Sequence, residues 1–310
     1  YFSSAASDVY KRQEYGGVIP EIAARDHSAK IIGILKQLLK QTDHNLEDIN
    51  LIAYTAGPGL IGSLMIGETV AKTIANVLNI ELLPINHLEG HILAPGLEEG
   101  GLEPPYLCLL VSGGHTQIIR FDDYGEYKII GETIDDACGE AFDKVGKLLN
   151  LEYPGGPKVS KLAEKGDSKR FKFPRAMMKD KNLNFSFSGL KTSVLYALED
   201  LNEEDHADVA ASFQEAVIDA LTTKLMWAVQ DTKIHKLVCS GGVASNKLLR
   251  ERLKQMAANN NLEVSYPRME FCTDNAAMIA YAGFIRKKFK LPTYPTNFAR
   301  PRWPLGELYD

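Results

Sequence analysis

Amphipathic stretches and short apolar runs alternate along most of this chain. Apolar residues recur at helical spacing in 19–41, 61–78, 138–149, 190–201, 205–230 and 274–288, and in a stretch that ends at Met256. Apolar runs of strand length occupy 50–55, 81–85, 105–111, 116–121, 127–130, 236–239 and 262–266. Strands that alternate with helices predict an α/β fold with a largely buried sheet.

Glycine turns follow three of the predicted strands, in the strings TAGPG, VSGGH and CSGGV. Glycine lets backbone N–H groups approach an anion closely, as they do in nucleotide sites. A glycine after a strand is also an ordinary turn residue, so each string alone leaves both interpretations open. With three such strings in one chain, a nucleotide-type site and plain turns are about equally well supported.

Composition and charge narrow the classes of protein. A length of 310 residues favours two domains or one large bilobal domain, and a net charge of −5 requires any nucleic acid to bind through a local basic patch. The stretch 165–181, with seven Lys or Arg against two Asp, is the visible candidate and reads as an exposed basic excursion. Four cysteines without CxxC spacing exclude a zinc ribbon and favour a reducing cytosol, and no apolar run is long enough to span a bilayer.

A pair of histidines is the first candidate for chemistry. His87 and His91 are four residues apart, so on a helix their side chains share one face and can bind one metal ion. Two unrelated surface histidines remain the alternative. A zinc-protease motif is excluded, because Leu88 stands where that motif has its catalytic glutamate. A third ligand has to come from elsewhere in the chain, and two histidines with one carboxylate and open positions suit iron or zinc.

Two acidic residues outside this motif are candidates for binding. Asp274 opens a predicted helix, where an acid is an ordinary N-terminal residue, but the small residues after it would let a ligand approach closely. The helix dipole explains the acids at the start of the helix 138–149, but Asp143 lies deeper in that helix. It is therefore a candidate hydrogen-bond partner for a ribose or another hydroxyl.

Seven longer strings occur in a fixed order, and together they resemble one family. The strings are INHLEGH, LLVSGGHTQ, DDACGEAFDKVGKLL, YPGGP, FSFSGLKT, CSGGVASNKLLR and TDNAAMIA. From about Gly17 to Asp310 the chain is similar to the TsaD/Kae/Gcp family, the universal subunit of tRNA threonylcarbamoyladenosine synthases. The resemblance implies an actin-like ATPase (ASKHA) fold with two βββαβα lobes and a nucleotide in the cleft between them.

The resemblance also implies an activity. Members are acyltransferases, N6-L-threonylcarbamoyladenine synthases, which transfer the threonylcarbamoyl group of threonylcarbamoyl-AMP to an adenosine of tRNA. The acceptor is the exocyclic amine of the adenosine 3′ of the anticodon in tRNAs that read ANN codons. Two other functions stay open: an actin-like small-molecule kinase, which does not explain the histidine pair, and a non-catalytic scaffold paralogue, which generally lacks that pair.

Carried over by position, the resemblance makes His87, His91 and Asp274 the ligands of one divalent metal ion, with Fe2+ as the first expectation and Zn2+ as the alternative. It implies substrate-binding roles for a second group: Leu110, Val111, Ser112, Gly113, Gly114, Asp143, Gly156 and Asn246. Many members have an aspartate where this chain has Ser160, which puts that contact in doubt. His115, beside the substrate loop, is our candidate for the general base.

The implied partners are tRNA, threonylcarbamoyl-AMP and a separate adenylate-forming synthase, with a paralogous dimer subunit (TsaB) and a small ATPase (TsaE) if the protein is bacterial. We expect a cytoplasmic protein that does not bind membranes. Basic residues that are candidates for tRNA contact lie in 165–181 and 286–290 and at Arg300 and Arg302.

The beginning of the chain departs from the family pattern. Members begin with a strand and turn of the kind ETSCDET, whereas residues 1–13 here read as a foreign or disordered segment. We therefore expect 14–100 to form a partial lobe one without its first β-hairpin, and a less stable protein whose activity by itself is in question. We expect 101–284 to form lobe two, with 165–181 as a basic insertion, and 285–310 to return to lobe one.

Overall fold

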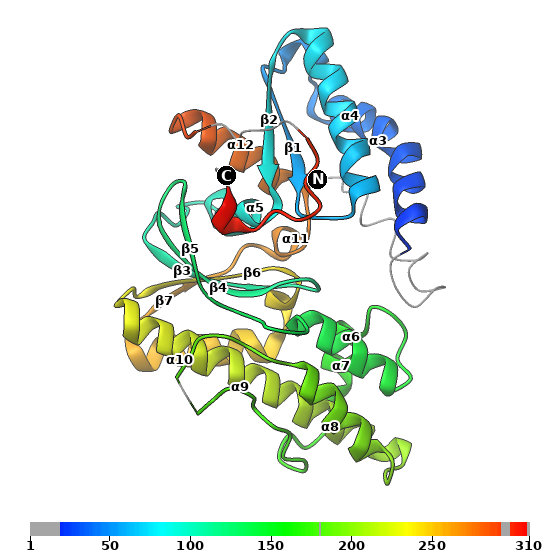
Figure 1. Ribbon diagram of the computed structural model, residues 1–310, viewed down its shortest axis with the longest axis vertical. Coiled ribbons are helices and arrows are strands. Elements are labelled where there is room, and N and C mark those ends of the chain that lie inside the picture. Colours follow the sequence, from blue (N-terminus) through cyan, green and yellow to red (C-terminus); the bar gives the residue numbers. More distant parts are fainter. Residues whose placement is uncertain (1–18, 180, 293–297, 309–310) are drawn as a thin grey trace. The chain divides into compact units, whose positions relative to one another are not determined.

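The computed structural model describes residues 19–179, 181–292 and 298–308, and over these ranges the chain has a mixed α/β fold (Figure 1). It divides into two compact units, each described here by itself. Unit 1 contains residues 19–102, 123–127 and, with its gap, 273–308; unit 2 contains residues 103–122 and 128–272. The segment 1–13, which we expected to be foreign or disordered, lies outside the described residues.

Two parallel strands joined by one helix form the centre of unit 1. The strands pair from Leu51–Glu81 to Thr55–Ile85, where the sequence predicts two buried strands. The elements of this unit are α3 (Pro20–Thr42), η1 (Leu46–Asp48), β1 (Leu51–Gly57), α4 (Ile61–Leu78), β2 (Glu81–Asn86), α5 (His87–Leu93), η2 (Ala94–Leu97), α12 (Ala276–Lys288) and η5 (Leu305–Glu307).

The helix α12 packs on β1, β2 and α5, and it brings the end of the chain back to unit 1. Gly283 makes this contact close, because a Cβ atom at that position would lie 2.7 Å from the Cβ of Ala53 on β1. The return to unit 1 therefore begins at Thr273, ahead of α12, rather than at residue 285 as we expected.

The segment after the gap at 293–297 crosses the end of β1. The Arg300 N–H donates to the Ala56 carbonyl (2.6 Å), and the Gly59 N–H donates to the Pro301 carbonyl (3.2 Å). A Cβ atom at Gly57 would lie 1.9 Å from the Arg300 carbonyl oxygen. The close crossing of two backbones thus explains a glycine of the TAGPG turn without any ligand.

A five-stranded sheet with the order β5-β4-β3-β6-β7 forms the core of unit 2. The predicted hairpin is confirmed, since β3 and β4 pair antiparallel from Tyr106–Phe121 to Val111–Thr116, and β6 runs parallel to β3. The strands are β3 (Tyr106–Val111), β4 (Thr116–Asp123), β5 (Glu126–Glu132), whose turn belongs to unit 1, β6 (Lys236–Ser240) and β7 (Glu263–Ser265).

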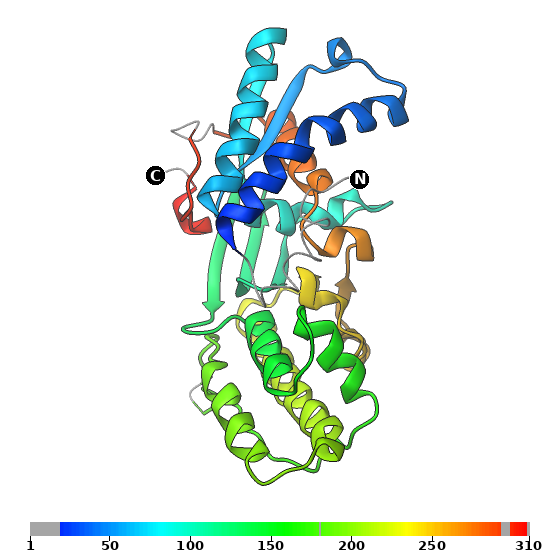
Figure 2. The same ribbon diagram turned by 90° about the vertical axis from the view of Figure 1, so that its right-hand side faces the viewer.

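The long helices of unit 2 lie on one side of this sheet (Figures 1 and 2). α9 contacts α7, α8 and α10, and its apolar residues join those of β3 and β6 in one core. The helices are α6 (Cys138–Leu148), α7 (Gly155–Ala163), α8 (Ser188–Leu198), η3 (Glu203–Asp205), α9 (His206–Thr232), η4 (Gly242–Ser245), α10 (Lys247–Asn260) and α11 (Met269–Cys272). Among the described residues of both units, no helix combines the length and the apolar character that crossing a membrane requires.

Candidate functional site

The helix α5 follows strand β2 directly, and Asn86 fixes its first turn. The buried Asn86 side chain accepts a hydrogen bond from the Leu88 N–H (2.9 Å) through Oδ1 and donates to the Trp303 carbonyl (3.0 Å) through Nδ2. A side-chain oxygen at this position satisfies one of the N–H groups that a helix start leaves unpaired. His87 is therefore the first residue of the helix, and His91 follows one turn later.

The two histidines meet the carboxylate of Asp274, which precedes α12. The Nε2 atoms of His87 and His91 each lie 3.2 Å from Asp274 Oδ1. Asn275 caps α12 by accepting a hydrogen bond from the Met278 N–H (2.9 Å), which fixes the chain next to Asp274. The structure thus brings together the three residues that the sequence comparison with the family singled out as metal ligands.

The electrostatics of this cluster favour a neutral His91 beside an ionised Asp274. His91 is 2% exposed, and burial lowers its pKa, although the hydrogen bond with Asp274 acts in the opposite direction. Packing around the Asp274 carboxyl by itself would raise its pKa, but hydrogen bonds with the two imidazoles hold that pKa well below its usual range. Metal ions bind these protonation states of histidine and aspartate.

Two of the three separations between donor atoms match those found around a metal ion. Two ligand atoms that each lie about 2.1 Å from one ion, at bond angles of roughly 90° to 110°, are about 3.0 to 3.4 Å apart. The separation of 3.2 Å between each imidazole Nε2 and Asp274 Oδ1 falls in this range. The 4.8 Å within which all three donor atoms lie is wider than this range, so the two imidazoles would have to approach each other to bind one ion. The Asp274 side chain is 60% exposed, so the cluster is open to solvent on the carboxylate side.

The predicted substrate loop, in unit 2, begins at the end of the buried strand β3, which carries Leu110 and Val111. Ser112 organises the turn: its Oγ accepts hydrogen bonds from the N–H groups of Gly114 (3.3 Å) and His115 (3.1 Å), and its own N–H donates to the His115 carbonyl (2.8 Å). Within the described part of the chain, the Gly113 N–H makes no hydrogen bond. Gly113 is therefore the one residue of the Ser112–Gly114 string whose N–H group remains available to an anion.

Asp143 and Gly156, two further predicted binding residues, contact each other. Asp143 Oδ1 accepts hydrogen bonds from the N–H groups of Gly155 (2.8 Å) and Gly156 (3.1 Å), which are the first residues of α7. Burial raises the pKa of Asp143, against the lowering effect of these two N–H groups. One oxygen of the carboxyl thus holds the start of a helix, and the predicted role toward a ribose would fall to the other.

Asn246, the last of the predicted binding residues, is already committed within the protein. Its Nδ2 donates to Ser160 Oγ (2.8 Å) and Gln214 Oε1 (2.7 Å), and its Oδ1 accepts from the Leu249 N–H (3.0 Å) at the start of α10. Ser160, which replaces a common family aspartate, is therefore held by Asn246. Gln214 was missed at the sequence level, because nothing in the pattern of α9 distinguishes it from a surface glutamine.

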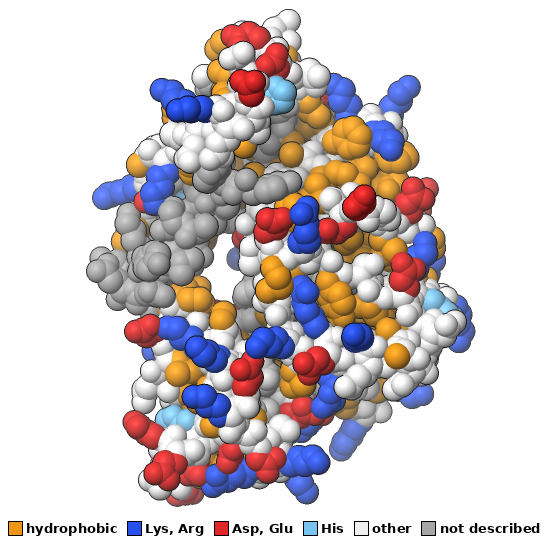
Figure 3. All heavy atoms as spheres, turned by 180° about the vertical axis from the view of Figure 1, so that it is seen from behind, with side chains coloured by type: hydrophobic (Ala, Val, Ile, Leu, Met, Phe, Trp, Pro, Cys, Tyr) orange, Lys and Arg blue, Asp and Glu red, His pale blue; other side chains and the backbone are white. Residues whose placement is uncertain are grey.

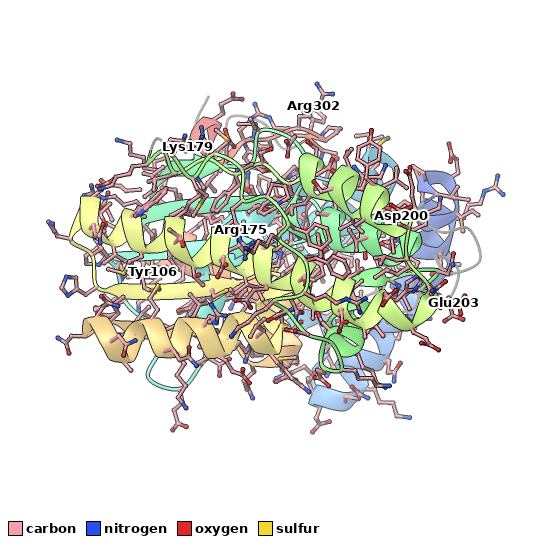
Figure 4. The ribbon with its side chains drawn as sticks, turned by 90° about the horizontal axis from the view of Figure 1, so that it is seen from below. Tyr106, Arg175, Lys179, Asp200, Glu203 and Arg302 are labelled. Carbon is pink, nitrogen blue, oxygen red and sulfur yellow. The ribbon has the colours of Figure 1, made fainter. Side chains whose placement is uncertain are left out.

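The segment 165–181 is less free than its composition suggested. Arg170 forms ion pairs with Asp205 (2.6 Å) and Asp208 (2.7 Å), and Arg175 forms one with Asp219 (2.7 Å). In Figure 4, Arg175 lies beside the ribbon of α9 and Lys179 lies farther out. The expectation of an exposed basic excursion therefore holds for only part of the segment, in which the exposed lysines are Lys165, Lys169, Lys172, Lys179 and Lys181.

Other basic candidates are also partly committed. Arg286 is 3% exposed and forms an ion pair with Glu89, so it cannot serve as a surface contact for RNA. Lys287 pairs with Glu81 (2.9 Å). The lower part of the face in Figure 3 shows Lys and Arg side chains interspersed with Asp and Glu rather than gathered in one field. Any tRNA contact would therefore depend on a small number of exposed lysines.

Comparisons with known proteins place these observations in a family. The solved structures of full-length HypF, in its phosphate- and nucleotide-bound form, and of T. kodakarensis HypF are similar to this chain, with TM-scores of 0.62 and 0.61. The sequence identities are 13% and 17%, over 84% and 80% of this chain, which spans about two fifths of each HypF chain (41%). This likeness shows the fold, which is actin-like, as expected from the sequence.

The sequence itself matches a family model over residues 3–281, which is most of the chain. That model is described as TsaD, tRNA N6-adenosine threonylcarbamoyltransferase. The His87, His91 and Asp274 cluster and the Ser112–Gly114 loop both lie within the matched range. This chain therefore belongs to the TsaD family of tRNA N6-adenosine threonylcarbamoyltransferases.

Proposed function

We propose that this protein transfers the threonylcarbamoyl group of threonylcarbamoyl-AMP to the exocyclic amine of the adenosine 3′ of the anticodon in tRNAs that read ANN codons. Membership of the TsaD family supports a tRNA acyltransferase of this type. The observation that carries the proposal is the convergence of His87, His91 and Asp274, because a kinase or a scaffold does not need such a cluster. Fe2+ is the metal we propose for it, with Zn2+ as the alternative.

The reaction asks for orientation and charge stabilisation. The donor is a mixed anhydride, so the adenosine amine attacks its carbamoyl carbon, the bond from that carbon to the phosphate oxygen breaks, and AMP leaves with the bonding electrons. A divalent ion held by His87, His91 and Asp274 would supply Lewis-acid stabilisation of the negative charge on donor oxygens. The Gly113 N–H group can donate a hydrogen bond to the phosphate or to the carbonyl oxygen.

One proton has to leave the amine, and we propose His115 as the group that accepts it. His115 is half-buried directly after the glycine loop, where Ser112 Oγ holds its N–H group. An imidazole is the side chain best suited to accept a proton near neutral pH. Its role is separable from that of the metal ligands, since it lies in unit 2 and they lie in unit 1.

No side chain is needed as a nucleophile, and the thiols are poorly suited to that role. The four cysteines are buried and form no disulfide within the described part of the chain. Burial raises the pKa of Cys108 to about 12 and raises the pKa values of Cys138 and Cys239 above their ordinary range, so that these thiols stay protonated. Reduced, buried thiols also fit the cytoplasmic location that we propose.

The proposed partners are tRNA, held by the exposed lysines of 165–181, and for a bacterial protein the paralogous subunit TsaB, the ATPase TsaE and an adenylate-forming synthase. The test incubates the protein with these partners, tRNA, threonine, bicarbonate and ATP, and measures threonylcarbamoyladenosine in the digested tRNA by mass spectrometry. We expect His91→Ala and Asp274→Ala to lower the product by about 100-fold or more. His44→Ala, at an exposed histidine that follows α3 and is not part of the cluster, should leave the product unchanged.

Absence of product with this chain, in a mixture where another TsaD family member forms it, would contradict the proposed activity. Product formed equally well by His91→Ala would contradict the role of the cluster instead.

A further inference from the structure

The helix α5, which carries His87 and His91, also carries Glu89, and Glu89 is not one of the three clustered residues. Glu89 is fully buried, and its Oε1 accepts hydrogen bonds from Arg286 Nη1 (2.9 Å) and from the Tyr127 hydroxyl (2.9 Å). Arg286 is in the last turn of α12, and its Nη2 donates to the Pro292 carbonyl. A buried carboxylate on α5 is therefore joined to α12 and to the first residues of β5.

The same two helices contact each other again at Gly90. A Cβ atom at that position would lie 2.9 Å from Ile279 Cδ1 and 3.2 Å from Met278 Cγ, which are in the first turn of α12. Asp274 precedes that turn. The helices α5 and α12 are thus joined at two points: a close apolar contact next to the cluster, and an ion pair at the far end of α12.

The two contacts together hold α5 in one position on α12, which the apolar contact alone would not do. Packing at Gly90 alone would allow α5 to rotate or slide on α12, and such movement would carry His87 and His91 away from Asp274. Glu89 lies on the opposite side of α5 from the histidines, so its bond to Arg286 resists that movement. An arginine suits this task because its planar, forked guanidinium donates in two directions, here to Glu89 and to Pro292.

We propose that Glu89 and Arg286 are positioning residues of the metal centre: their buried pair sets α5 against α12 so that His87, His91 and Asp274 converge. The pair acts through the backbone of both helices and does not touch the ion. This inference rests on the proposed metal centre and adds residues that the motif spacing does not assign to it.

The test measures metal binding by the full chain, with Co2+ as the probe. Affinity is obtained by competition with a chelator, and the visible absorption of bound Co2+ reports the coordination geometry. We expect Glu89→Gln and Arg286→Met to weaken Co2+ binding by about 10-fold or more and to change the spectrum. The matched control is Glu68→Gln, at another buried carboxylate of unit 1, which accepts hydrogen bonds from Lys72 and from the Ala299 N–H (2.9 Å); it should keep the affinity and the spectrum even if it melts earlier.

Two gentler variants keep the test decisive if the first pair folds poorly. Tyr127→Phe removes one hydrogen bond to Glu89 and should weaken Co2+ binding by about two- to fivefold. Arg286→Lys keeps the charge but lacks the rigid planar fork that holds both acceptors at once, and it should bind Co2+ with an affinity between those of wild type and Arg286→Met.

Wild-type affinity and spectrum in all folded variants would overturn the proposal, whatever their melting temperatures. Should the wild-type chain show no Co2+ binding that His91→Ala abolishes, the metal centre itself would be wrong and the positioning role with it. Tight Co2+ binding by a chain that forms no threonylcarbamoyladenosine would instead contradict only the proposed reaction.

Discussion

The Asn86 side chain offers a sharp test of how the start of α5 is held. It makes one hydrogen bond that caps the helix and one that holds the Trp303 carbonyl, and both are buried. Asn86→Ala removes both at once. The substitution leaves the Leu88 N–H and the Trp303 carbonyl without these partners in a region that water does not reach.

The expected cost follows from these two losses. Loss of an N-cap costs about 0.5–2 kcal/mol. A buried carbonyl left without its donor costs about 1–3 kcal/mol. We therefore expect Asn86→Ala to lower the free energy of unfolding by about 1.5–5 kcal/mol. At roughly 2–4 °C per kcal/mol, the melting temperature should fall by about 3–20 °C.

The two contributions can be separated with a second substitution. Asn86→Asp keeps an oxygen that can cap α5 but replaces the donor with an oxygen facing the Trp303 carbonyl, so that burial and this carbonyl raise the pKa of the new carboxyl. The folded state then binds a proton more tightly than the unfolded state, and stability should rise as the pH falls from 8 toward 5. Asn86→Ala should show no such gain relative to wild type.

Denaturant unfolding, followed by circular dichroism at several pH values, measures both effects. Asn260→Ala serves as the control, because the exposed Asn260 side chain only donates to the Met256 carbonyl within its own helix (2.8 Å), and it should cost less than about 0.5 kcal/mol. A loss below about 1 kcal/mol in Asn86→Ala would refute the reasoning, as would an Asn86→Asp protein whose stability does not rise on acidification.

Three further predictions concern other parts of the chain. Gly283→Ala should lower the free energy of unfolding by about 1–3 kcal/mol, because the new Cβ would lie 2.7 Å from an alanine of β1. The control Gly67→Ala, in a helix and with nothing within 4 Å of the new Cβ, should raise it by about 0.5–1 kcal/mol. Equal effects of the two substitutions in thermal unfolding would contradict the packing of α12. Partial burial alone would raise the pKa of Asp135, but two serine hydroxyls and two backbone N–H groups lower that pKa. The ionised carboxylate therefore stabilises the fold above the ordinary pKa of an aspartate, and this stabilisation is lost as the pH falls through the lowered pKa. The loss of stability in Asp135→Asn at pH 7 should accordingly become smaller in acid. Each exposed lysine of 165–181 replaced by Gln should reduce the slope of log K for tRNA against log salt by about 0.7–0.9 if it contacts a phosphate, whereas Arg170→Gln should lower stability and leave the slope unchanged.

Local patterns predicted the elements well wherever the apolar period was continuous. The helix 61–78, the hairpin 105–111 with 116–121, and the strand 236–239 all appear, because the helix has an uninterrupted period of 3.6 and the strands are short apolar runs. The helix α7 was missed. Its first residues, after Tyr153 and Pro154, are glycines that read as a turn, and what starts the helix is Asp143, a carboxylate from another helix that binds their N–H groups.

The candidate site also contains features that the local sequence predicts and features that it does not. The spacing of His87 and His91 predicts a shared helix face, but no spacing in the sequence links them to Asp274, which only the family resemblance supplied. Residues that hold the site, such as Asn86 and Glu89, were not identified because their partners come from distant segments. The local sequence predicts which side chains share a face of one helix. Whether those side chains meet residues of other segments depends on how the segments pack.

The five residues of the string HLEGH show how a short motif can organise the proposed metal centre. Successive residues of an α-helix are rotated by about 100°, so His87 and His91 are only about 40° apart, and Glu89 lies on the opposite side of the helix from His87. Leu88 enters the core of unit 1, and Gly90 lets the helix approach α12 more closely than any other residue would allow. The packing therefore requires a glycine at position 90. Each direction around the helix is thus used once: toward a cation, toward the core, toward a neighbouring helix and toward a buried arginine. A substitution anywhere in the string therefore disturbs the same cluster by a different route, and those routes can be told apart by measuring metal affinity and stability on the same variants.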